Sequence, residues 1–435
     1  MDQDAVFRRY DIRGEYGNEI DEEFARLLGK ATGTFAHRRF SGEVTVSRDN
    51  KTSSVPLKKE LIKGIRSTGA DVYDAGEGPT DYAALTGRRF GTPTVQVTSS
   101  HLPLNSNGFK LMYPAGNGFK NTDLDRIEEL FRNRDFREGS GNYTRVEKAS
   151  KNYYRKRLLE SGRGPGAEKT VVVETMGGAA RKLLPQVLAE SGAEVIDLAR
   201  GKPEGPYFDP PRPDPEILEN VEKAVEEHGA DLGVATDMDA DRAAVYFNGR
   251  WITGDELFGI LAQLFESPEV VASVDTSEAV EEVVRAAGGA ISYTRVGDPF
   301  VVDQALKADA DLAGEPNGHY CFPKFVPYNS GILTCLTASN IRLEELLEKI
   351  PEYTTLEEDV KVAEKEEVLS KVVEKARQSF SIVSEVDGVK YVDGDATVLI
   401  RSSGSSPIIR VKAESRDRSE ARRALEAAVK LVRNQ

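Results

Sequence analysis

Three aspartates alternate with other residues in the hexapeptide DMDADR, which directly follows the apolar run 232–235. Alternate side chains on an extended loop point the same way, so Asp237, Asp239 and Asp241 can hold one hard divalent cation through oxygen. An EF-hand is excluded because its loop requires glycine at the sixth position, where Arg242 stands. A solvated acidic turn is the alternative. Since Mg²⁺ commonly completes its shell with water or phosphate oxygen, the loop predicts one Mg²⁺ per chain that faces a phosphate.

A second polar loop, Thr98–Pro103, follows the predicted strand Thr94–Val97. In open α/β sheets, ligands bind at the carboxyl ends of the strands. Ser100 stands beside His101, and Lys110 follows further along, so the loop could supply a nucleophile with nearby acid/base groups. A Ser-His-Asp hydrolase is not indicated, because the G-x-S-x-G elbow is missing. A polar turn with ordinary hydroxyl-to-backbone bonds is the alternative.

A third loop, with the sequence GEPNGH, follows the predicted strand Ala310–Ala313. Glu315 can accept two hydrogen bonds from sugar hydroxyls, and Asn317 offers both a donor and an acceptor. His319 can exchange a proton near neutral pH. On its own the pattern is equally typical of a glycine-flanked polar turn.

A fourth loop has the sequence RSSGSSP and is followed by a second arginine. Hydroxyls, backbone N–H groups around a glycine and flanking guanidinium groups can together bind a phosphate. A serine-rich hairpin turn is the alternative. The candidate phosphate-binding residues are Arg401, Ser403, Gly404, Ser405 and Arg410.

The elements that must position these loops follow a repeated pattern, in which an amphipathic helix ends at a glycine and a short apolar strand follows. The apolar spacing of three and four residues predicts the helices, and the glycine suits a left-handed C-terminal cap. Alternating helices and strands predict α/β units with a largely parallel sheet. The four predicted helices, each with its following strand segment, are 57–68 with 69–73, 182–191 with 192–196, 217–228 with 229–234, and 277–287 with 288–291.

The last part of the chain has a different pattern. A predicted helix over 366–378 and a closing helix over 419–432 flank short strand-like segments with Asp-Gly turns, which indicates an antiparallel α+β module. Together with polar stretches near 138–150, 249–254 and 351–353, this predicts four domains. Their predicted ranges are 1–145, 146–250, 251–350 and 351–435.

Over essentially the whole chain, the four loops, in their order along the sequence, resemble those of the α-D-phosphohexomutase family. The segment FRRYDIRG at 7–14 is similar to a family N-terminal signature, and DMDADR matches the family's D-x-D-x-D-R metal loop in full. The resemblance implies three related α/β domains with mixed, largely parallel sheets and a C-terminal α+β domain, arranged around a central cleft. One active-site loop would lie in each domain, and the hinged fourth domain would open and close.

The resemblance also implies roles for individual residues. Ser100 would carry a phosphate and, through it, join the three aspartates as a metal ligand. Lys110 and His319 would be the acid/base groups, with His101 in support, and Arg13 and Arg242 would add positive potential. The implied substrate-binding residues are Tyr10, Glu315, Asn317, Arg401, Ser403, Gly404, Ser405 and Arg410.

The loops depart from the family pattern at a few positions. Ser99 replaces the usual alanine and Leu102 the usual asparagine, while Asn317 replaces a serine of the sugar loop. Ser405 keeps the hydroxyl of the usual threonine, but Ser406 lacks the carboxylate of the usual glutamate. The serine, the metal ligands, Lys110, Glu315 and Arg401 are all retained.

The implied activity is the interconversion of hexose 1-phosphate and hexose 6-phosphate, on glucose or mannose phosphates, through a phosphoserine and a sugar 1,6-bisphosphate. A phosphoglucosamine mutase is the first alternative, because Asn317 does not decide between the sugars. A metal-dependent sugar phosphatase and a non-catalytic sugar-phosphate-binding protein are the others.

Composition limits the partners. The 435 residues carry 58 lysines and arginines against 72 aspartates and glutamates, a net charge of −14, which argues against nucleic-acid and polybasic membrane binding. No apolar run is long enough to cross a membrane, and the acidic N-terminus resembles no secretory signal, so we expect a cytoplasmic protein. Cys321 and Cys335 are expected to be buried thiols. The expected partner is a small phosphosugar, and the sequence does not decide between a monomer and a homo-oligomer.

Overall fold

The computed structural model describes residues 6–8, 10–162, 168–403 and 406–435. The chain divides into two compact units. Unit 1 consists of Met1–Ile252 and Gly318–Arg342, and unit 2 consists of Thr253–Asn317 and Leu343–Gln435. Each unit therefore contains two separate stretches of sequence.

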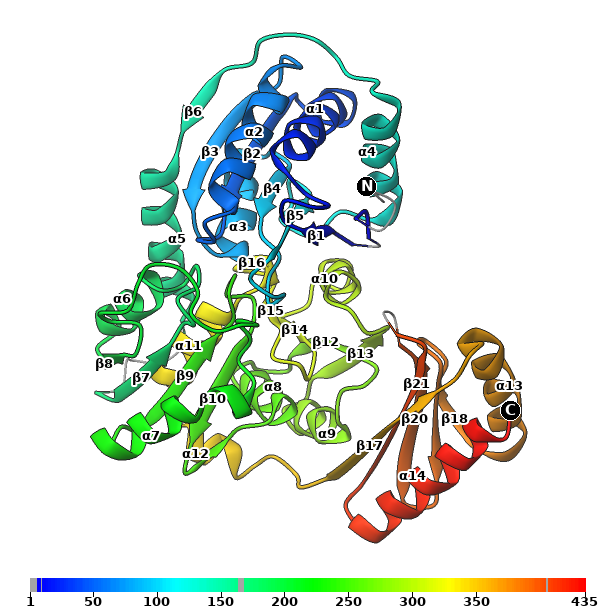
Figure 1. The fold of residues 1–435 in the computed structure, drawn as a ribbon. Coiled ribbons are helices and arrows are strands. Elements are labelled where there is room, and N and C mark those ends of the chain that lie inside the picture. Colours follow the sequence, from blue (N-terminus) through cyan, green and yellow to red (C-terminus); the bar gives the residue numbers. More distant parts are fainter. Residues whose placement is uncertain (1–5, 9, 163–167, 404–405) are drawn as a thin grey trace. The chain divides into compact units, whose positions relative to one another are not determined.

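The first sheet of unit 1 has six strands in the order β1-β5-β4-β2-β3-β6 (Figure 1). Strands β4, β2, β3 and β6 are parallel, whereas β5 and β1 run antiparallel to their neighbours. The strands are β1 (Ile12–Glu15), β2 (Glu43–Arg48), β3 (Asp71–Glu77), β4 (Thr94–Val97), β5 (Ser106–Met112) and β6 (Tyr143–Arg145). The helices of this part are α1 (Glu22–Arg39), α2 (Ser54–Arg66), α3 (Thr80–Phe90), α4 (Asn121–Asn133) and α5 (Glu147–Ser161).

Helices α1 and α2 lie side by side (Figure 1), and glycines allow their backbones to approach closely. A Cβ atom added to Gly29 would lie 2.2 Å from the carbonyl oxygen of Leu61, and one added to Gly64 would lie 2.0 Å from that of Arg26. Both helices contribute to a core that also contains Val44 and the other apolar residues of the sheet. Glycine is therefore required at these two helical positions despite its low helix propensity.

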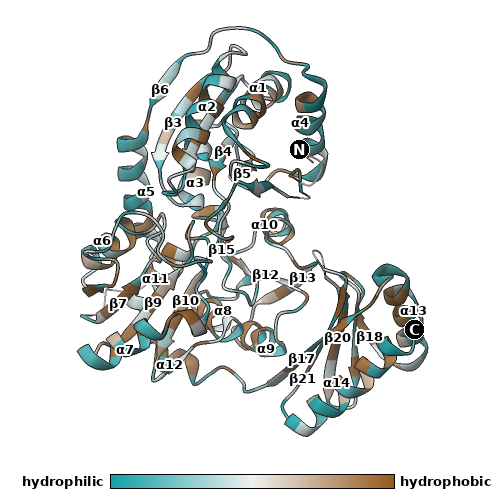
Figure 2. Ribbon diagram, viewed as in Figure 1, coloured by the Kyte–Doolittle hydropathy of each residue, from teal (hydrophilic) through white to brown (hydrophobic). Residues whose placement is uncertain are grey.

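The second sheet of unit 1 has the order β11-β10-β9-β7-β8, with β7 parallel to β8 and β9 and with β10 antiparallel to both of its neighbours. Figure 2 shows β9 and β10 as largely hydrophobic, which fits strands that are covered by helices. The strands are β7 (Thr170–Glu174), β8 (Glu194–Asp197), β9 (Leu232–Thr236), β10 (Ala243–Phe247) and β11 (Arg250–Trp251). The helices are α6 (Leu183–Glu190), the short 3₁₀ helix η2 (Pro215–Ile217) and α7 (Glu219–His228).

The second stretch of unit 1 contributes an antiparallel hairpin and a helix, namely β15 (Tyr320–Phe322), β16 (Val326–Asn329) and α11 (Gly331–Asn340). Every residue of α11 is buried. Cys335 on this helix donates its thiol to the carbonyl oxygen of Ala235 in β9, at 3.8 Å. The late stretch is thus part of the core of unit 1.

Unit 2 begins with a parallel arrangement in which β12 (Glu269–Ser273) pairs with both β13 (Ala290–Thr294) and β14 (Leu312–Gly314). Its helices are α8 (Gly254–Ala262), α9 (Glu278–Ala286), α10 (Asp298–Lys307) and α12 (Leu343–Leu347).

The C-terminal part of unit 2 is an antiparallel sheet in the order β17-β21-β20-β19-β18, against which α13 (Lys365–Ser379) and α14 (Arg418–Arg433) pack. The strands are β17 (Thr354–Lys361), β18 (Ser381–Ser384), β19 (Val389–Asp393), β20 (Ala396–Ser402) and β21 (Ile408–Ser415). Buried Glu414 of β21 accepts hydrogen bonds from the Ser277 hydroxyl, the Glu278 N–H (3.0 Å) and the Thr355 hydroxyl (3.1 Å). Glu414 thereby ties the start of α9 to the C-terminal sheet.

The predicted fold class is confirmed: the first three sheets along the chain belong to α/β arrangements, and the C-terminal sheet is antiparallel. The glycines predicted to cap the four repeated helices, Gly69, Gly192, Gly229 and Gly288, all have positive φ values, between 59° and 103°. Strand β17 was not predicted. The four domain ranges and the three boundaries between them remain predictions. In the part of the chain that the structure describes, no helix is both long enough and apolar enough to cross a membrane.

Candidate active site

The three aspartates of the DMDADR loop converge at the end of β9. Asp237, Asp239 and Asp241 are buried, and each offers a carboxylate oxygen within 4.8 Å of the other two. The loop turns at Ala240, whose φ of +58° lies in the left-handed region. β9 is an inner strand of its sheet, and the loop that follows it keeps all three carboxylates buried.

Two carboxylate oxygens of the cluster have no hydrogen-bond donor in the described part of the chain. Among the described residues, Asp237 Oδ2 and Asp239 Oδ1 are buried and accept no hydrogen bond. Burial, followed by the charges of Asp241 and Asp239, raises the pKa of Asp237 well above its usual range. A buried carboxylate oxygen that accepts no hydrogen bond is costly, and hard oxygen ligands at this spacing suit a divalent cation such as Mg²⁺. The residues present therefore fit a metal.

Lys110 in β5 contacts two of these aspartates. Its Nζ lies 2.7 Å from Asp239 Oδ2 and 2.7 Å from Asp241 Oδ2. Burial alone would lower the pKa of Lys110, but the two carboxylates raise it well above its usual range. Burial alone would raise the pKa of Asp241, but Lys110 and His319 hold it well below its usual range. Lys110 is thus a fixed ammonium group that partly neutralises the cluster.

Ser100 and His101 lie in the loop that follows β4. Ser100 is buried and has a φ of +54°, an unusual conformation for a residue other than glycine. Its Oγ lies 3.2 Å from His101 Nδ1, and its N–H donates to the Thr98 hydroxyl at 3.0 Å. Burial, and then the charges of Arg242 and Arg13, lower the pKa of His101 to about 2. The imidazole beside Ser100 is therefore neutral at physiological pH.

Arg242 and His319 meet beside the metal loop, although 77 positions separate them in the sequence. Arg242 Nε donates to His319 Nε2 at 3.1 Å, and the same ring nitrogen lies 3.3 Å from Asp241 Oδ1. Arg13 lies in β1, opposite Gly108 of β5, and forms an ion pair with Asp11 at 2.5 Å. Tyr10 is half-buried just before this strand.

The predicted sugar-binding residues belong to unit 2. Glu315 follows β14, is buried, and accepts a hydrogen bond from the Gly297 N–H at 2.7 Å. Asn317 is exposed two residues later. One carboxylate oxygen of Glu315 thus already has a backbone partner.

The predicted phosphate-binding residues lie on β20 and β21, where Arg401 and Arg410 are paired across the sheet. Arg401 lies 3.7 Å from Asp275, and Arg410 forms an ion pair with Asp359 at 2.9 Å, which raises the pKa of Arg410. The Ser403 N–H donates to the Ile408 carbonyl at 3.0 Å. Gly404 and Ser405 lie outside the described residues.

The structure therefore brings together, within unit 1, one group of predicted residues: Ser100, His101, Lys110, Asp237, Asp239, Asp241, Arg242 and His319. Arg13 belongs to the same unit and acts on His101 through its charge. Glu315, Asn317, Arg401, Ser403 and Arg410 form a second group, in unit 2.

Two supporting residues were missed by sequence reasoning. Thr80, at the start of α3, donates its hydroxyl to Asp239 Oδ2 at 2.6 Å and its N–H to the Asp239 carbonyl at 3.0 Å. Lys51 is buried and donates to the Ser99 hydroxyl at 2.6 Å and to the Ser106 carbonyl at 3.1 Å. Each residue follows the carboxyl end of a parallel strand, and that position was the signal that could have identified them.

A third supporting residue, Lys365 of α13, lies beside the predicted phosphate loop. Its Nζ donates to the Ser403 carbonyl at 2.5 Å and to the Ser406 carbonyl at 3.3 Å. It thereby contacts the backbone of both Ser403 and Ser406.

Comparison with known protein families accounts for nearly the whole chain. Residues 4–138, 152–250 and 253–356 match phosphoglucomutase/phosphomannomutase alpha/beta/alpha domains I, II and III, respectively. Residues 357–431 match the phosphoglucomutase/phosphomannomutase C-terminal domain.

Individual relatives cover the chain almost end to end. A phosphoglucomutase/phosphomannomutase from Thermococcus kodakarensis is 33% identical, with 98% of each chain covered. A probable phosphoglucosamine mutase from Methanothermobacter thermautotrophicus is also 33% identical, over 96% of this chain and 95% of the relative. The crystal structure of a phosphoglucomutase/phosphomannomutase family protein from Burkholderia thailandensis superposes with a TM-score of 0.87 at 25% identity, covering 98% of each chain.

Proposed function

Because the chain belongs to the phosphoglucomutase/phosphomannomutase family, whose members are isomerases that move a phosphate within a sugar, we propose that it interconverts hexose 1-phosphate and hexose 6-phosphate. The resemblance seen in the sequence is confirmed at the level of the family. The proposed substrates are glucose and mannose phosphates. The observation that carries the proposal is the buried aspartate cluster, with its unpaired carboxylate oxygens, in the same unit as the strained Ser100.

We assign the phosphoryl carrier to Ser100. In the first half-reaction, a sugar hydroxyl oxygen forms a bond to the phosphorus, the bond from phosphorus to Ser100 Oγ breaks, and Oγ leaves with the electron pair. The product is a sugar 1,6-bisphosphate. After this intermediate reorients, Ser100 Oγ attacks its other phosphate, which returns the phosphoryl group to the enzyme.

Protons must move at Ser100 Oγ and at the sugar hydroxyl. His101 Nδ1 lies 3.2 Å from Oγ and is neutral, so it can accept a hydrogen bond from the Ser100 hydroxyl and orient Oγ for attack. With a pKa of about 2 it is too weak a base to keep the proton, so we assign the proton acceptor to a phosphate oxygen of the bisphosphate. His319 is the proposed base for the sugar hydroxyl. Lys110 is held protonated by its two carboxylate neighbours, so we assign it the role of a positive charge and hydrogen-bond donor rather than that of an acid/base group.

Asp237, Asp239 and Asp241 would hold one Mg²⁺. When bound, the cation neutralises charge on the transferring phosphoryl group. The protein's part is to keep the three carboxylates fixed, through the hydrogen bonds of Thr80 and Lys110 to the cluster.

Substrate recognition is assigned to unit 2. Arg401, Ser403, Gly404 and Ser405 would hold the phosphate that is not being transferred, with Arg410 in support. Glu315 and Asn317 would hydrogen-bond the sugar hydroxyls, and Tyr10, Arg13 and Arg242 would add contacts and positive charge from unit 1.

A phosphoglucosamine mutase is the second candidate, and the Methanothermobacter relative favours it as strongly as the Thermococcus relative favours the first. A turnover assay with glucose, mannose and glucosamine 1-phosphates, primed with the matching 1,6-bisphosphates, separates the two. Release of inorganic phosphate in place of an isomerised product would instead indicate a sugar phosphatase.

Mass spectrometry of the intact protein tests the mechanism. A fraction of the protein should be heavier by one phosphate that maps to Ser100, and the S100A variant should lack both this phosphate and the turnover. An S100A variant with full activity would refute the proposed carrier.

A further inference from the structure

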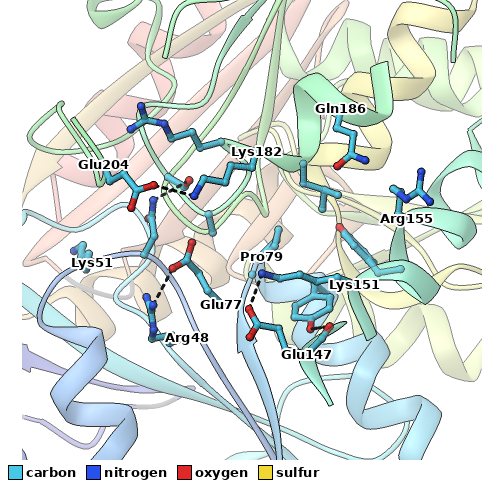
Figure 3. A pocket seen from close by; sticks show the side chains of 18 of the residues that line it. Arg48, Lys51, Glu77, Pro79, Glu147, Lys151, Arg155, Lys182, Gln186 and Glu204 are labelled. Atoms are coloured by element: carbon cyan, nitrogen blue, oxygen red, sulfur yellow. Dashed lines mark hydrogen bonds and ion pairs between the residues drawn. The ribbon is translucent and has the colours of Figure 1, made fainter. Parts of the chain in front are cut away.

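A cavity of about 760 Å³ lies within unit 1, and the residues proposed to do chemistry do not line it. It is bounded by the ends of β2 and β3, by α5 and by the start of α6 (Figure 3). None of the aspartates of the metal loop lines it, nor does Ser100, His101 or Lys110. Its volume is in the range of small-molecule sites, roughly 300–1,000 Å³.

The cavity has the opposite charge to the chain as a whole. Eight lysine and arginine side chains line it, against three glutamates, in a protein whose net charge is −14. Two of the glutamates each form an ion pair with a lining cation. Glu77 lies 2.9 Å from Arg48, and Glu204 lies 2.8 Å from Lys182 (Figure 3). These two pairs leave six lining cations and one further glutamate.

The third glutamate serves two cations at once. Glu147 forms ion pairs with Arg145 at 2.6 Å and with Lys151 at 2.8 Å. Lys148 forms no ion pair with any described residue, and Arg155 pairs only with Glu190, which lies outside the lining. Among the described cations that α5 contributes to the lining, Lys148 is therefore the one without a carboxylate partner, and the lining as a whole keeps an excess of five positive charges, eight cations against three glutamates.

The wall is not only charged. Pro79, Leu183 and Val55 contribute apolar surface, and Val55 is 50% exposed, which is unusual for a large aliphatic side chain. An apolar patch beside a group of cations suits a ligand with an anionic end and an apolar body. We propose that this cavity binds an organic phosphate of the size of a nucleoside diphosphate.

Lys51 connects this cavity to the loop that carries Ser100. It lines the cavity, and its Nζ donates to the Ser99 hydroxyl at 2.6 Å and to the carbonyls of Ser106 (3.1 Å) and Pro103 (3.3 Å). A phosphate in the cavity competes for these N–H donors and weakens the support of the loop. Bound organic phosphate therefore lowers the turnover; this coupling rests on the proposed mutase function, whereas the binding does not.

Calorimetric titration of the full chain with adenosine diphosphate tests the binding. A metal-free buffer with chelator excludes binding through a cation. The K148E/R155E double variant should bind at least about tenfold more weakly, since the loss of one hydrogen bond to a charged group already corresponds to about one decade in affinity. The matched control K430E reverses an exposed lysine of α14 in unit 2 and should bind normally, as should R401A.

Three results would overturn the binding proposal. The first is the absence of binding at about 5 mM nucleotide, a concentration that detects even weak, millimolar affinity. The second is binding that R401A abolishes and K148E/R155E preserves, which would place the nucleotide at the phosphosugar site. The third is equal binding of inorganic pyrophosphate, which would remove the role of the apolar wall. Binding by the wild type with no effect on turnover would refute the coupling through Lys51.

Discussion

Replacing Asp81 with asparagine is expected to change how the stability of unit 1 depends on pH. Asp81 lies in the first turn of α3 and is fully buried. Its carboxylate accepts hydrogen bonds from Tyr154 of α5 at 2.6 Å, from Ser330 before α11 at 2.5 Å, and from the Tyr82 N–H at 2.8 Å. Despite these donors, burial raises the pKa of Asp81 from 3.8 to about 7.

The direction of the effect follows from this shift. Between pH 4 and pH 7 the folded protein keeps a proton on Asp81 that the unfolded chain has lost, so stability falls as the pH rises. The stabilising contribution is complete below the unfolded pKa of 3.8 and is lost as the pH passes through about 7. A shift of about three pH units at about 1.4 kcal/mol per unit corresponds to roughly 4 kcal/mol.

Asparagine has the shape of the protonated acid but does not ionise. The free energy of unfolding of Asp81→Asn relative to the wild type should therefore increase by roughly 4 kcal/mol between pH 4 and pH 8. Urea denaturation can be followed by the fluorescence of Trp251, the only tryptophan of the chain, which lies in unit 1. Taking the difference between the two proteins removes the titration of the other carboxyl groups.

Tyr154→Phe serves as the matched control, because it removes a donor that lowers the pKa of Asp81. As the pH rises, the stability of Tyr154→Phe should begin to fall at the same pH as that of the wild type, but should continue to fall up to a higher pH. If Asp81→Asn and the wild type show parallel pH profiles, the buried carboxyl does not titrate as argued.

Three further outcomes are expected. Lys110→Met removes the ammonium group that lies 2.7 Å from both Asp239 and Asp241. In metal-free buffer the free energy of unfolding of unit 1 should therefore fall by about 3–5 kcal/mol, and Mg²⁺ should restore part of this loss. If the variant and the wild type are equally stable in urea denaturation, the role assigned to Lys110 is contradicted. Asp239→Asn should weaken Mg²⁺ binding by at least about tenfold in calorimetry, and unchanged affinity would exclude this aspartate as a ligand. Gly64→Ala should destabilise unit 1 by about 1–3 kcal/mol because its Cβ would lie 2.0 Å from the Arg26 carbonyl, whereas Gly118→Ala, with no atom within 4 Å, should be nearly neutral.

Local sequence patterns predicted much of the fold and the principal loops. The left-handed glycines at 69, 192, 229 and 288 each follow a periodic helix, and the alternating aspartates directly follow an apolar strand. Strand β17 was missed because its sequence, TTLEEDVK, has few apolar residues and its side chains alternate between half-buried and exposed over most of its length. Its strand conformation comes from its pairing with β21, which no local pattern encodes.

The supporting residues of the site were harder to predict for a related reason. Thr80 contacts Asp239 across 159 positions of sequence, and Lys51 contacts Ser99 across 48. A single threonine or lysine after a strand has no distinctive spacing, so only the folded chain reveals its role. By contrast, Arg242 and His319 were both singled out by their loops, although their contact with each other was not foreseen.

The discontinuous make-up of unit 1 has a consequence for how the protein is synthesised. The hairpin and α11, from Gly318 to Arg342, supply Ser330 to Asp81 and His319 to Arg242, and every residue of α11 is buried. A nascent chain that has emerged only as far as Ile252 therefore lacks part of the core and one partner of the metal loop. Synthesis of unit 1 begins first, but unit 1 is complete only after Arg342 has left the ribosome. By then the first stretch of unit 2, Thr253–Asn317, has already been made.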